Sequence, residues 1–112
     1  MKPSLILAAA GLSVTLLSAP VQAADAAAAE ALAKKEACLK CHAIDKKKEA
    51  VSLKDIAKKH AGKPDAEAKI LQQITTGVKV KLEDSTEEEH KTLKTKDQAA
   101  ISNLIQWILS LK

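Results

Sequence analysis

The sequence predicts an all-α fold, and three observations lead to that prediction. The chain of 112 residues is rich in Ala, Leu, Ile, Lys and Glu, whereas its only aromatic residue is Trp107. Sheets favour β-branched and aromatic residues, so an all-β fold is excluded. Near the C-terminus, Ile101, Leu104, Ile105 and Ile108 recur at the spacing of a buried helical stripe. A hydrophobic content of 46% also argues against wholesale disorder.

The first 23 residues have the form of a secretory signal peptide. Lys2 supplies a positive charge, an apolar run extends from Leu5 to Leu17, and Val21 and Ala23 occupy the −3 and −1 positions of a cleavage site. The apolar run is shorter than the about 20 residues that span a membrane. We therefore predict cleavage after Ala23 and a periplasmic protein of one domain, residues 24–112, with no stable membrane insertion. An uncleaved N-terminal anchor is the alternative.

Residues 24–112 predict a nearly all-helical chain. The predicted elements are an Ala-rich helix over 24–37, a short helix over 52–61, a helix from Pro64 that Gly77 ends, an extended segment over 78–82 and a last helix that starts at a capping box, Thr95–Gln98. Small residues in the first helix allow the last helix to cross it closely. The acidic stretch that ends at His90 is expected to be a mobile loop.

Lysine supplies every positive charge of the chain. Nucleic-acid binders rely on Arg forks and stacking aromatic residues, and the chain lacks Arg, Phe and Tyr, so we expect no nucleic-acid partner. Residues 24–63 carry a net charge of +4 and residues 64–112 a net charge of −1. Seven lysines follow the first cysteine closely: Lys40, Lys46, Lys47, Lys48, Lys54, Lys58 and Lys59. They predict a surface that steers acidic protein partners, with an ordinary solvated surface as the alternative.

The two cysteines and a histidine form the motif Cys38-Leu39-Lys40-Cys41-His42. C-x-x-C-H is the attachment signature of a c-type haem. Two thiols one short turn apart can each add to a vinyl group of the porphyrin, which leaves the imidazole of His42 under the iron. A large flat porphyrin would also fill a core that has no Phe or Tyr. We predict one covalently bound haem c, with Cys38 and Cys41 as its thioethers and His42 as the proximal ligand.

Other uses of the two cysteines remain open at this point. A disulfide suits an exported chain, but it leaves His42 unexplained and closes little chain entropy. A thioredoxin-like pair requires a βαβ context that the sequence does not show. A zinc site from both cysteines and two of His42, His60 and His90 is chemically reasonable, although zinc sites of this kind usually have a second closely spaced ligand pair.

The sequence resembles the class I c-type cytochromes, particularly the small bacterial cytochromes c551/c552. The resemblance covers an Ala/Lys-rich helix that leads into the haem motif, the segments Ser52–Ala57 and Asp65–Ile70, and the closing stretch Leu104–Leu111. It implies a small class I cytochrome c fold, in which N- and C-terminal helices pack around one haem, and a function in electron transfer. It implies no enzymatic activity, and no acid–base constellation accompanies the haem motif.

Two positions depart from the family's pattern. Family members usually have Gly-Pro before the equivalent of Ser52, with the proline carbonyl holding the proximal imidazole, whereas this chain has Ala50 and Val51. The Nδ1–H of His42 still requires a backbone acceptor. Members also place a methionine, the sixth iron ligand, in the loop before the last helix. Residues 24–112 contain no methionine, so composition excludes that ligand.

His90 is the predicted distal ligand, because it lies at or near the family's methionine position, 17 residues before Trp107. His60 is the alternative distal ligand. If it does not bind the iron, its expected role is packing or contact with a haem carboxylate. A lysine (Lys79, Lys81, Lys91 or Lys94) or a vacant site completes the options. A second imidazole in place of a thioether lowers the reduction potential relative to Met-ligated relatives.

We therefore predict a monomeric, periplasmic one-electron shuttle that meets periplasmic or membrane-bound redox proteins through its lysine-rich face. The alternative function is binding or sensing of NO, CO or O₂ at a vacant or labile sixth site.

Overall fold

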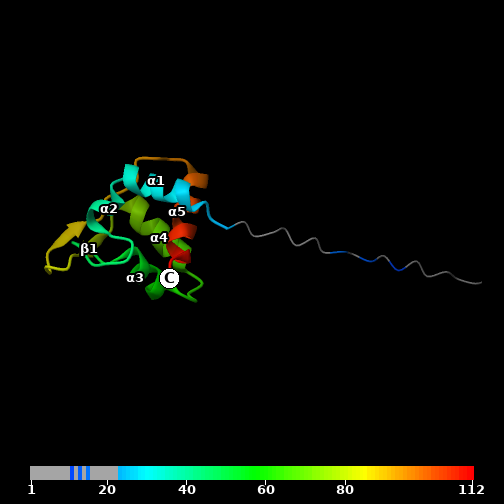
Figure 1. Cartoon of the computed structure of the whole chain (residues 1–112), viewed down its shortest axis with the longest axis horizontal. Helices are drawn as coiled ribbons and strands as arrows, with labels where there is room; N and C mark the ends of the chain where they lie inside the picture. The colour runs from blue at the N-terminus through cyan, green and yellow to red at the C-terminus, as the bar shows by residue number, and fades with distance from the viewer. Residues whose placement is uncertain (1–10, 12, 14, 16–22) are drawn as a thin grey trace, which may run out of the picture.

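The computed structural model describes residues 11, 13, 15 and 23–112. Most of the predicted signal peptide lies outside these residues, so cleavage after Ala23 stays a prediction. The elements in chain order are α1 (Ala26–Lys35), α2 (Cys38–Cys41), α3 (Leu53–His60), α4 (Ala66–Thr76), β1 (Lys79–Lys81), β2 (Glu87–Glu89) and α5 (Gln98–Ser110). The prediction of a mainly helical chain is confirmed (Figure 1). Within the described part of the chain, no helix has the length and apolar character needed to cross a membrane.

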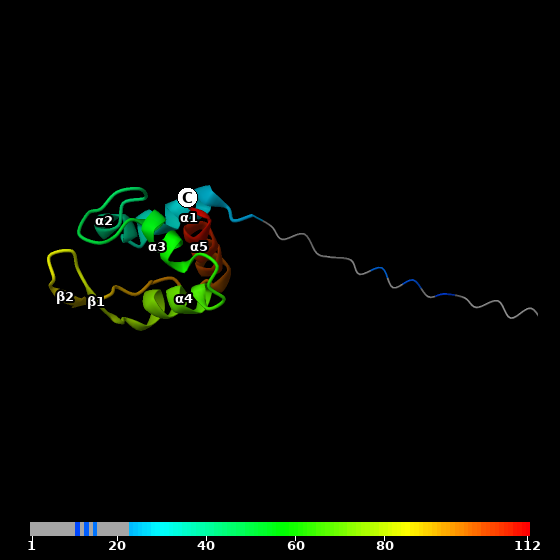
Figure 2. The same ribbon diagram turned by 90° about the horizontal axis from the view of Figure 1, so that it is seen from below.

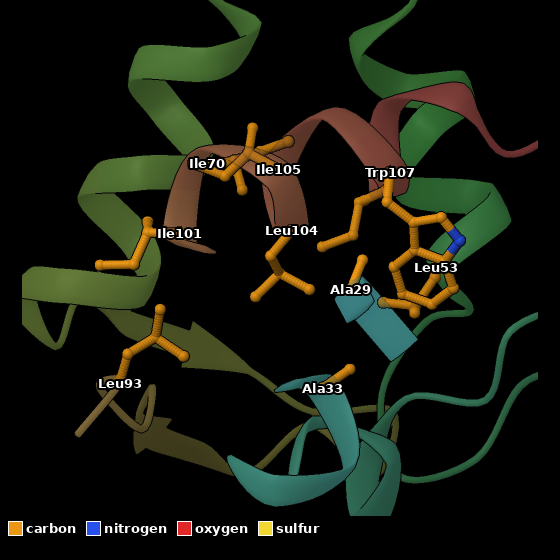
Figure 3. Close-up of a cluster of buried hydrophobic side chains, with 10 residues drawn as sticks. Ala29, Ala33, Leu53, Ile70, Leu93, Ile101, Leu104, Ile105 and Trp107 are labelled. Carbon is orange, nitrogen blue, oxygen red and sulfur yellow. The ribbon is translucent and has the colours of Figure 1, made fainter. Parts of the chain in front are cut away.

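The core forms where α1 crosses α5. Ala29 and Ala33 face the crossing and are almost completely buried, which lets the larger side chains Leu104 and Trp107 of α5 pack directly against α1 (Figure 3). Asp25, the N-cap of α1, and Asn103 of α5 form two reciprocal hydrogen bonds that fix the register: the Asp25 N–H donates to the Asn103 side-chain oxygen at 2.8 Å, and the Asn103 side-chain amide donates to the Asp25 carbonyl at 2.9 Å. The predicted packing of the terminal helices on each other is therefore confirmed.

Side chains cap three of the helices. The carboxylate of Asp25 accepts from the N–H of Ala28 at the start of α1, and the hydroxyl of the buried Ser52 begins α3 in the same way. The predicted capping box at Thr95 is wrong by two residues, because α5 starts at Gln98 with Asp97 as its N-cap. The reason is local: a carboxylate is a strong N-cap, and the N–H of Thr95 is already bound by the side chain of Glu36, just after α1.

The extended segment after α4 is one strand of a hairpin. Gly77 ends α4 in the left-handed region, with φ 66°, and turns the chain into β1. β1 pairs antiparallel with β2 in the register Lys79↔Glu89 and Lys81↔Glu87. The expectation of a loop is therefore wrong for residues 87–89, which form a strand, while the expected mobility stays a prediction. Opposite charges that face each other across two strands favour this pairing. Figure 2 shows the hairpin on the same side of the molecule as α2.

Candidate functional site

The haem motif occupies a single turn of helix. Ala37, with φ 61°, breaks α1 and starts α2, so that the thiols of Cys38 and Cys41 come from one turn. Both cysteines are free thiols in the structure and form no disulfide with each other. Burial raises the pKa of both thiols, and the carboxylate of Glu49, 3.5 Å from the Cys41 Sγ, raises that of Cys41 further. The polypeptide alone therefore keeps both sulfurs protonated.

His42 follows α2 and points one ring nitrogen at the backbone. Its Nδ1–H donates to the carbonyl of Val51 at 2.6 Å. The acceptor required by the imidazole is thus the carbonyl of the residue that replaces the family's proline. Two backbone hydrogen bonds hold the residues around Val51 against the motif and the residue after it: the Ala50 N–H donates to the Cys41 carbonyl, and the Leu53 N–H donates to the Ala43 carbonyl. Burial lowers the pKa of His42, which keeps its imidazole neutral, as a metal ligand must be.

His90 follows β2 and lies opposite His42. Its backbone N–H donates to the Val78 carbonyl at 2.8 Å, and its Nδ1–H donates to the Lys91 carbonyl, also at 2.8 Å. The ring centres of His42 and His90 are 6.2 Å apart, with 35° between their planes. Metal–imidazole bonds are about 2 Å long, so two imidazoles on opposite sides of one metal ion have ring centres about 6 Å apart. With both Nδ1 atoms engaged, each ring retains Nε2 for a metal.

A cavity of about 540 Å³ contains both thiols and all three histidines in its lining. Ligand sites typically enclose about 300–1,000 Å³ and are mainly apolar. Apolar side chains from α3, α4 and the hairpin make up much of this lining, among them Ile56, Ile74 and Val80. Two thiols, two opposed imidazoles and an apolar chamber suit a covalently attached porphyrin. In the region from residue 23 to the C-terminus, no three His, Cys, Asp or Glu side chains gather as a metal site, so the zinc alternative gains no support.

His60, the rival distal ligand, lines the same cavity from the last residue of α3. It is His90 that forms a ring pair with His42. The Nδ1 of His60 is buried and has no hydrogen-bond partner among the described residues. Burial, followed by the nearby lysines Lys59, Lys63 and Lys69, lowers the pKa of His60. Its role therefore needs a separate explanation.

The motif, the opposed imidazoles and the chamber together define a c-type haem protein. Comparison with known proteins agrees, because residues 26–112 match the sequence profile of the family described as Cytochrome c. The chain belongs to the cytochrome c family, and it carries one covalently bound c-type haem in a class I fold. It is thus an electron-transfer haem protein.

Individual relatives support the same assignment. The chain is similar to cytochrome c-551 of Pseudomonas aeruginosa, with 46% identity over 48 residues that cover 43% of this chain and 46% of the relative. The match therefore spans about half the length of that curated relative. Among solved structures, the chain resembles the class 1 cytochrome MtoD from Sideroxydans lithotrophicus ES-1, with 49% identity, a TM-score of 0.76, and coverage of 80% of this chain and 98% of that one. Nitrosomonas europaea cytochrome c552 is 31% identical, with a TM-score of 0.59 and coverage of 74% and 99%.

Sequence reasoning missed two contacts and one secondary-structure element that shape the site. It did not name Val51 as the acceptor for His42, although the vacancy left by the proline pointed to that position. It also missed the contact of Glu49 with Cys41, which no spacing rule signals. The hairpin that ends at His90 was not predicted, because β2 consists of three consecutive glutamates and glutamate has a low strand propensity.

Proposed function

We propose that the chain is a periplasmic one-electron shuttle with a bis-histidine haem. In this proposal Cys38 and Cys41 bind the haem covalently, His42 is the proximal ligand and His90 the distal one. When bound, the haem supplies a reversible Fe(III)/Fe(II) couple. The polypeptide holds both imidazoles in place, excludes water from the chamber and presents a charged face to partners.

One observation carries the ligand assignment: the 6.2 Å separation of the His42 and His90 ring centres, with each Nδ1 bound to a backbone carbonyl. A ligating imidazole almost always donates its other ring N–H to such an acceptor, which fixes the ring's orientation and tautomer. In both rings, the hydrogen bond from Nδ1–H to a backbone carbonyl therefore already fixes the orientation that a metal ligand requires.

The same geometry supports a reduction potential below that of Met-ligated relatives. A second imidazole in place of a thioether favours the ferric state. Glu83, Glu88 and Glu89 contribute to the cavity lining, and their negative charge favours ferric over ferrous iron. Lys79 and Lys81 face two of the strand glutamates and offset part of this effect.

Docking of acidic redox partners is proposed for the lysine-rich face beside the motif. Lys40, Lys46 and Lys59 are exposed there, whereas Lys47 is 3.2 Å from Glu83 in an ion pair. Electron-transfer complexes are small and short-lived, so steering by charge matters more than a large apolar contact. We propose a monomer that acts in the periplasm. The proposed compartment rests on the leader over residues 1–23, and the N-terminal sequence of the exported protein should begin at Ala24.

The ferric absorption spectrum of the holoprotein and of two matched variants tests the ligand assignment. The wild type should be six-coordinate and low-spin, and His90→Ala should convert it to a high-spin form that takes up CO once reduced. His60→Ala is the control and should stay low-spin. A wild-type spectrum that is already high-spin, or one that His90→Ala leaves unchanged, would overturn the assignment. In the first case, avid uptake of CO or NO would favour the sensor function instead.

A further inference from the structure

A short segment after the haem motif, residues 47–51, is bonded to the motif through its backbone. The N–H of Ala50 donates to the Cys41 carbonyl at 3.1 Å. The carbonyl of Val51 accepts from the His42 Nδ1–H at 2.6 Å. Neither bond uses a cysteine sulfur, so attachment of a haem to the thiols leaves both of them in place. We call residues 47–51 the strap.

The tip of the hairpin, residues 82–86, is a turn stabilised by its own hydrogen bonds. The N–H of Leu82 donates to the Thr86 carbonyl at 2.8 Å, and the N–H of Ser85 donates to the Leu82 carbonyl at 3.0 Å. The carboxylate of Asp84 accepts from the N–H of Thr86, also at 3.0 Å. These bonds lie within the turn, so the tip can move away from the rest of the molecule as one unit.

Glu83 joins the tip to the strap by two contacts. Its backbone N–H donates to the Glu49 carbonyl at 3.2 Å, and its carboxylate forms an ion pair with Lys47, also at 3.2 Å. Among the residues that the structure describes, no other member of the stretch 78–91 makes a hydrogen bond or ion pair outside that stretch. Figure 2 shows the yellow tip beside the loop that follows α2. One residue therefore fastens the far end of the hairpin.

The strap and the tip both line the cavity, residues 50–51 from the strap and residues 82–83 from the tip. The strap supplies the acceptor for His42, and the hairpin leads into His90. The two contacts of Glu83 therefore close the wall of the chamber between the segment that supports one imidazole and the segment that ends at the other.

We propose that Glu83 is a positioning residue that closes the hairpin against the strap and thereby limits exchange of the distal haem ligand. The inference rests on the proposed function, because it takes His90 as that ligand. His90 lies at the base of the hairpin, where its N–H bonds to the Val78 carbonyl. With Glu83 in place the hairpin is held at its base and at its tip. Release of the tip leaves only the base, and local opening of this kind controls access to many protein sites.

This closure distinguishes an electron carrier from a sensor built around the same chamber. An electron carrier needs no vacant position on the iron, whereas a sensor must admit a small molecule to it. The ion pair between Lys47 and Glu83 is exposed, so it is weak alone and salt weakens it further. Its effect should appear in the rate of ligand exchange and not in the ligand set at rest.

Replacement of His90 by added cyanide in the ferric holoprotein, followed by stopped-flow absorbance, tests the proposal. Lys47→Gln and Glu83→Gln each remove the ion pair and should speed the reaction about two- to fivefold, the range expected for an exposed pair. Lys46→Gln removes the same charge from the adjacent exposed position, where the structure gives no ion pair, and should react at the wild-type rate. At neutral pH the reagent is mainly uncharged HCN, so surface charge does not steer it.

Exchanging the two charges separates the ion pair from a general effect of charge. Lys47→Glu alone places two carboxylates together and should be the fastest variant. Adding Glu83→Lys to it restores opposite charges and should return the rate toward the wild-type value. A double variant as fast as Lys47→Glu alone, or equal rates in Lys47→Gln and Lys46→Gln, would overturn the inference.

Hydrogen exchange measures the same closure without any ligand replacement. The N–H of Glu83, which bonds to the Glu49 carbonyl, should exchange faster in Lys47→Gln than in the wild type. The N–H of Ala50, on the side of the strap that bonds to the motif, is the internal control and should not change. Unchanged exchange at Glu83 would show that the ion pair does not hold the tip.

The ferric spectrum separates this failure from failure of the proposed function. If the wild type is low-spin and His90→Ala is high-spin, but the Lys47 and Glu83 variants exchange ligands at the wild-type rate, the bis-histidine assignment stands and the closure falls. If the wild type is already high-spin, His90 is not the distal ligand and both proposals are overturned.

Discussion

Different forces hold two regions of the molecule in place. The first region is the crossing of α1 and α5, and the second is the hairpin segment, which we define as residues 78–93. The crossing is apolar and closely packed, with Ala33 completely buried and Leu104 only 1% exposed. The hairpin segment is mostly exposed, and cross-strand charge pairs and backbone hydrogen bonds hold it in place. Its one buried residue is Leu93, whose N–H donates to the carbonyl of Ile74 at 2.9 Å.

Because of this difference, the crossing and the hairpin segment should affect different properties: the crossing the stability of the fold, and the hairpin segment the position of His90. Apolar burial at the crossing stabilises the fold, since it removes the side chains of Ala33 and Leu104 from water. The hairpin segment positions His90 with weaker interactions and therefore responds more readily to salt and to single charges. Changes at the crossing should alter the unfolding midpoint, whereas changes in the segment should alter the haem's sixth ligand first.

The largest expected effect comes from Leu104→Ala. Removing this side chain leaves a cavity between α1 and α5, and such truncations cost about 2–5 kcal/mol. Guanidinium unfolding of the holoprotein, followed by far-UV circular dichroism, should show the loss. Ser102→Ala, on the exposed side of the same helix, is the control and should change stability by less than about 0.5 kcal/mol. Similar losses in the two variants would contradict a core centred on the crossing.

Ala33→Leu should have the next largest effect, with the opposite change in volume. The side chain of Ala33 is completely buried against α5, so added atoms would force the helices apart at a cost of about 1–3 kcal/mol. The same unfolding measurement applies. Ala31→Leu, on the exposed face of α1, should be tolerated. A neutral Ala33→Leu would mean that the close approach of the helices does not require a small residue there.

The crossing could be predicted from the sequence, because helical periodicity is a local property. The spacing of Ile101, Leu104, Ile105 and Ile108 is enough to identify the buried face of α5, and all four side chains are buried there. The haem-binding motif of Cys38, Cys41 and His42 could also be predicted from the sequence, since its chemistry depends on residues that are close together in the chain.

The hairpin segment was less predictable, because its contacts join distant or unpatterned residues. Each glutamate of β2 has low strand propensity, and only the lysine strand opposite makes the pairing favourable. The start of α5 was misplaced for a related reason: the N–H groups of Lys94 and Thr95 bind Glu36, which is almost sixty residues earlier. Composition predicted His90 as a ligand from the missing methionine, but not the carbonyl that supports its ring.

Glu36→Ala should have an intermediate effect and should connect the two regions. The Glu36 carboxylate, at the end of α1, accepts from the N–H groups of Lys94 at 2.8 Å and Thr95 at 3.1 Å, just after the hairpin segment. Losing both bonds should cost about 1–2 kcal/mol of stability. It should also speed the replacement of His90 by added cyanide, measured by stopped-flow absorbance. The control is Glu30→Ala, which removes only a surface ion pair with Lys34, and equal cyanide rates would contradict a tether through Glu36.

The smallest expected effect is that of Lys81→Glu, which places like charges opposite each other at Lys81 and Glu87. The pair is exposed, so the cost should be about 0.2–1 kcal/mol and local to the hairpin. Hydrogen exchange at the N–H of His90, which bonds to Val78, should accelerate at low salt. Because 1 M salt shortens the screening length to about 3 Å, it should restore the wild-type rate. Lys96→Glu makes the same charge change outside the hairpin segment, so equal acceleration in both variants would show that net charge, and not strand pairing, controls the mobility of His90.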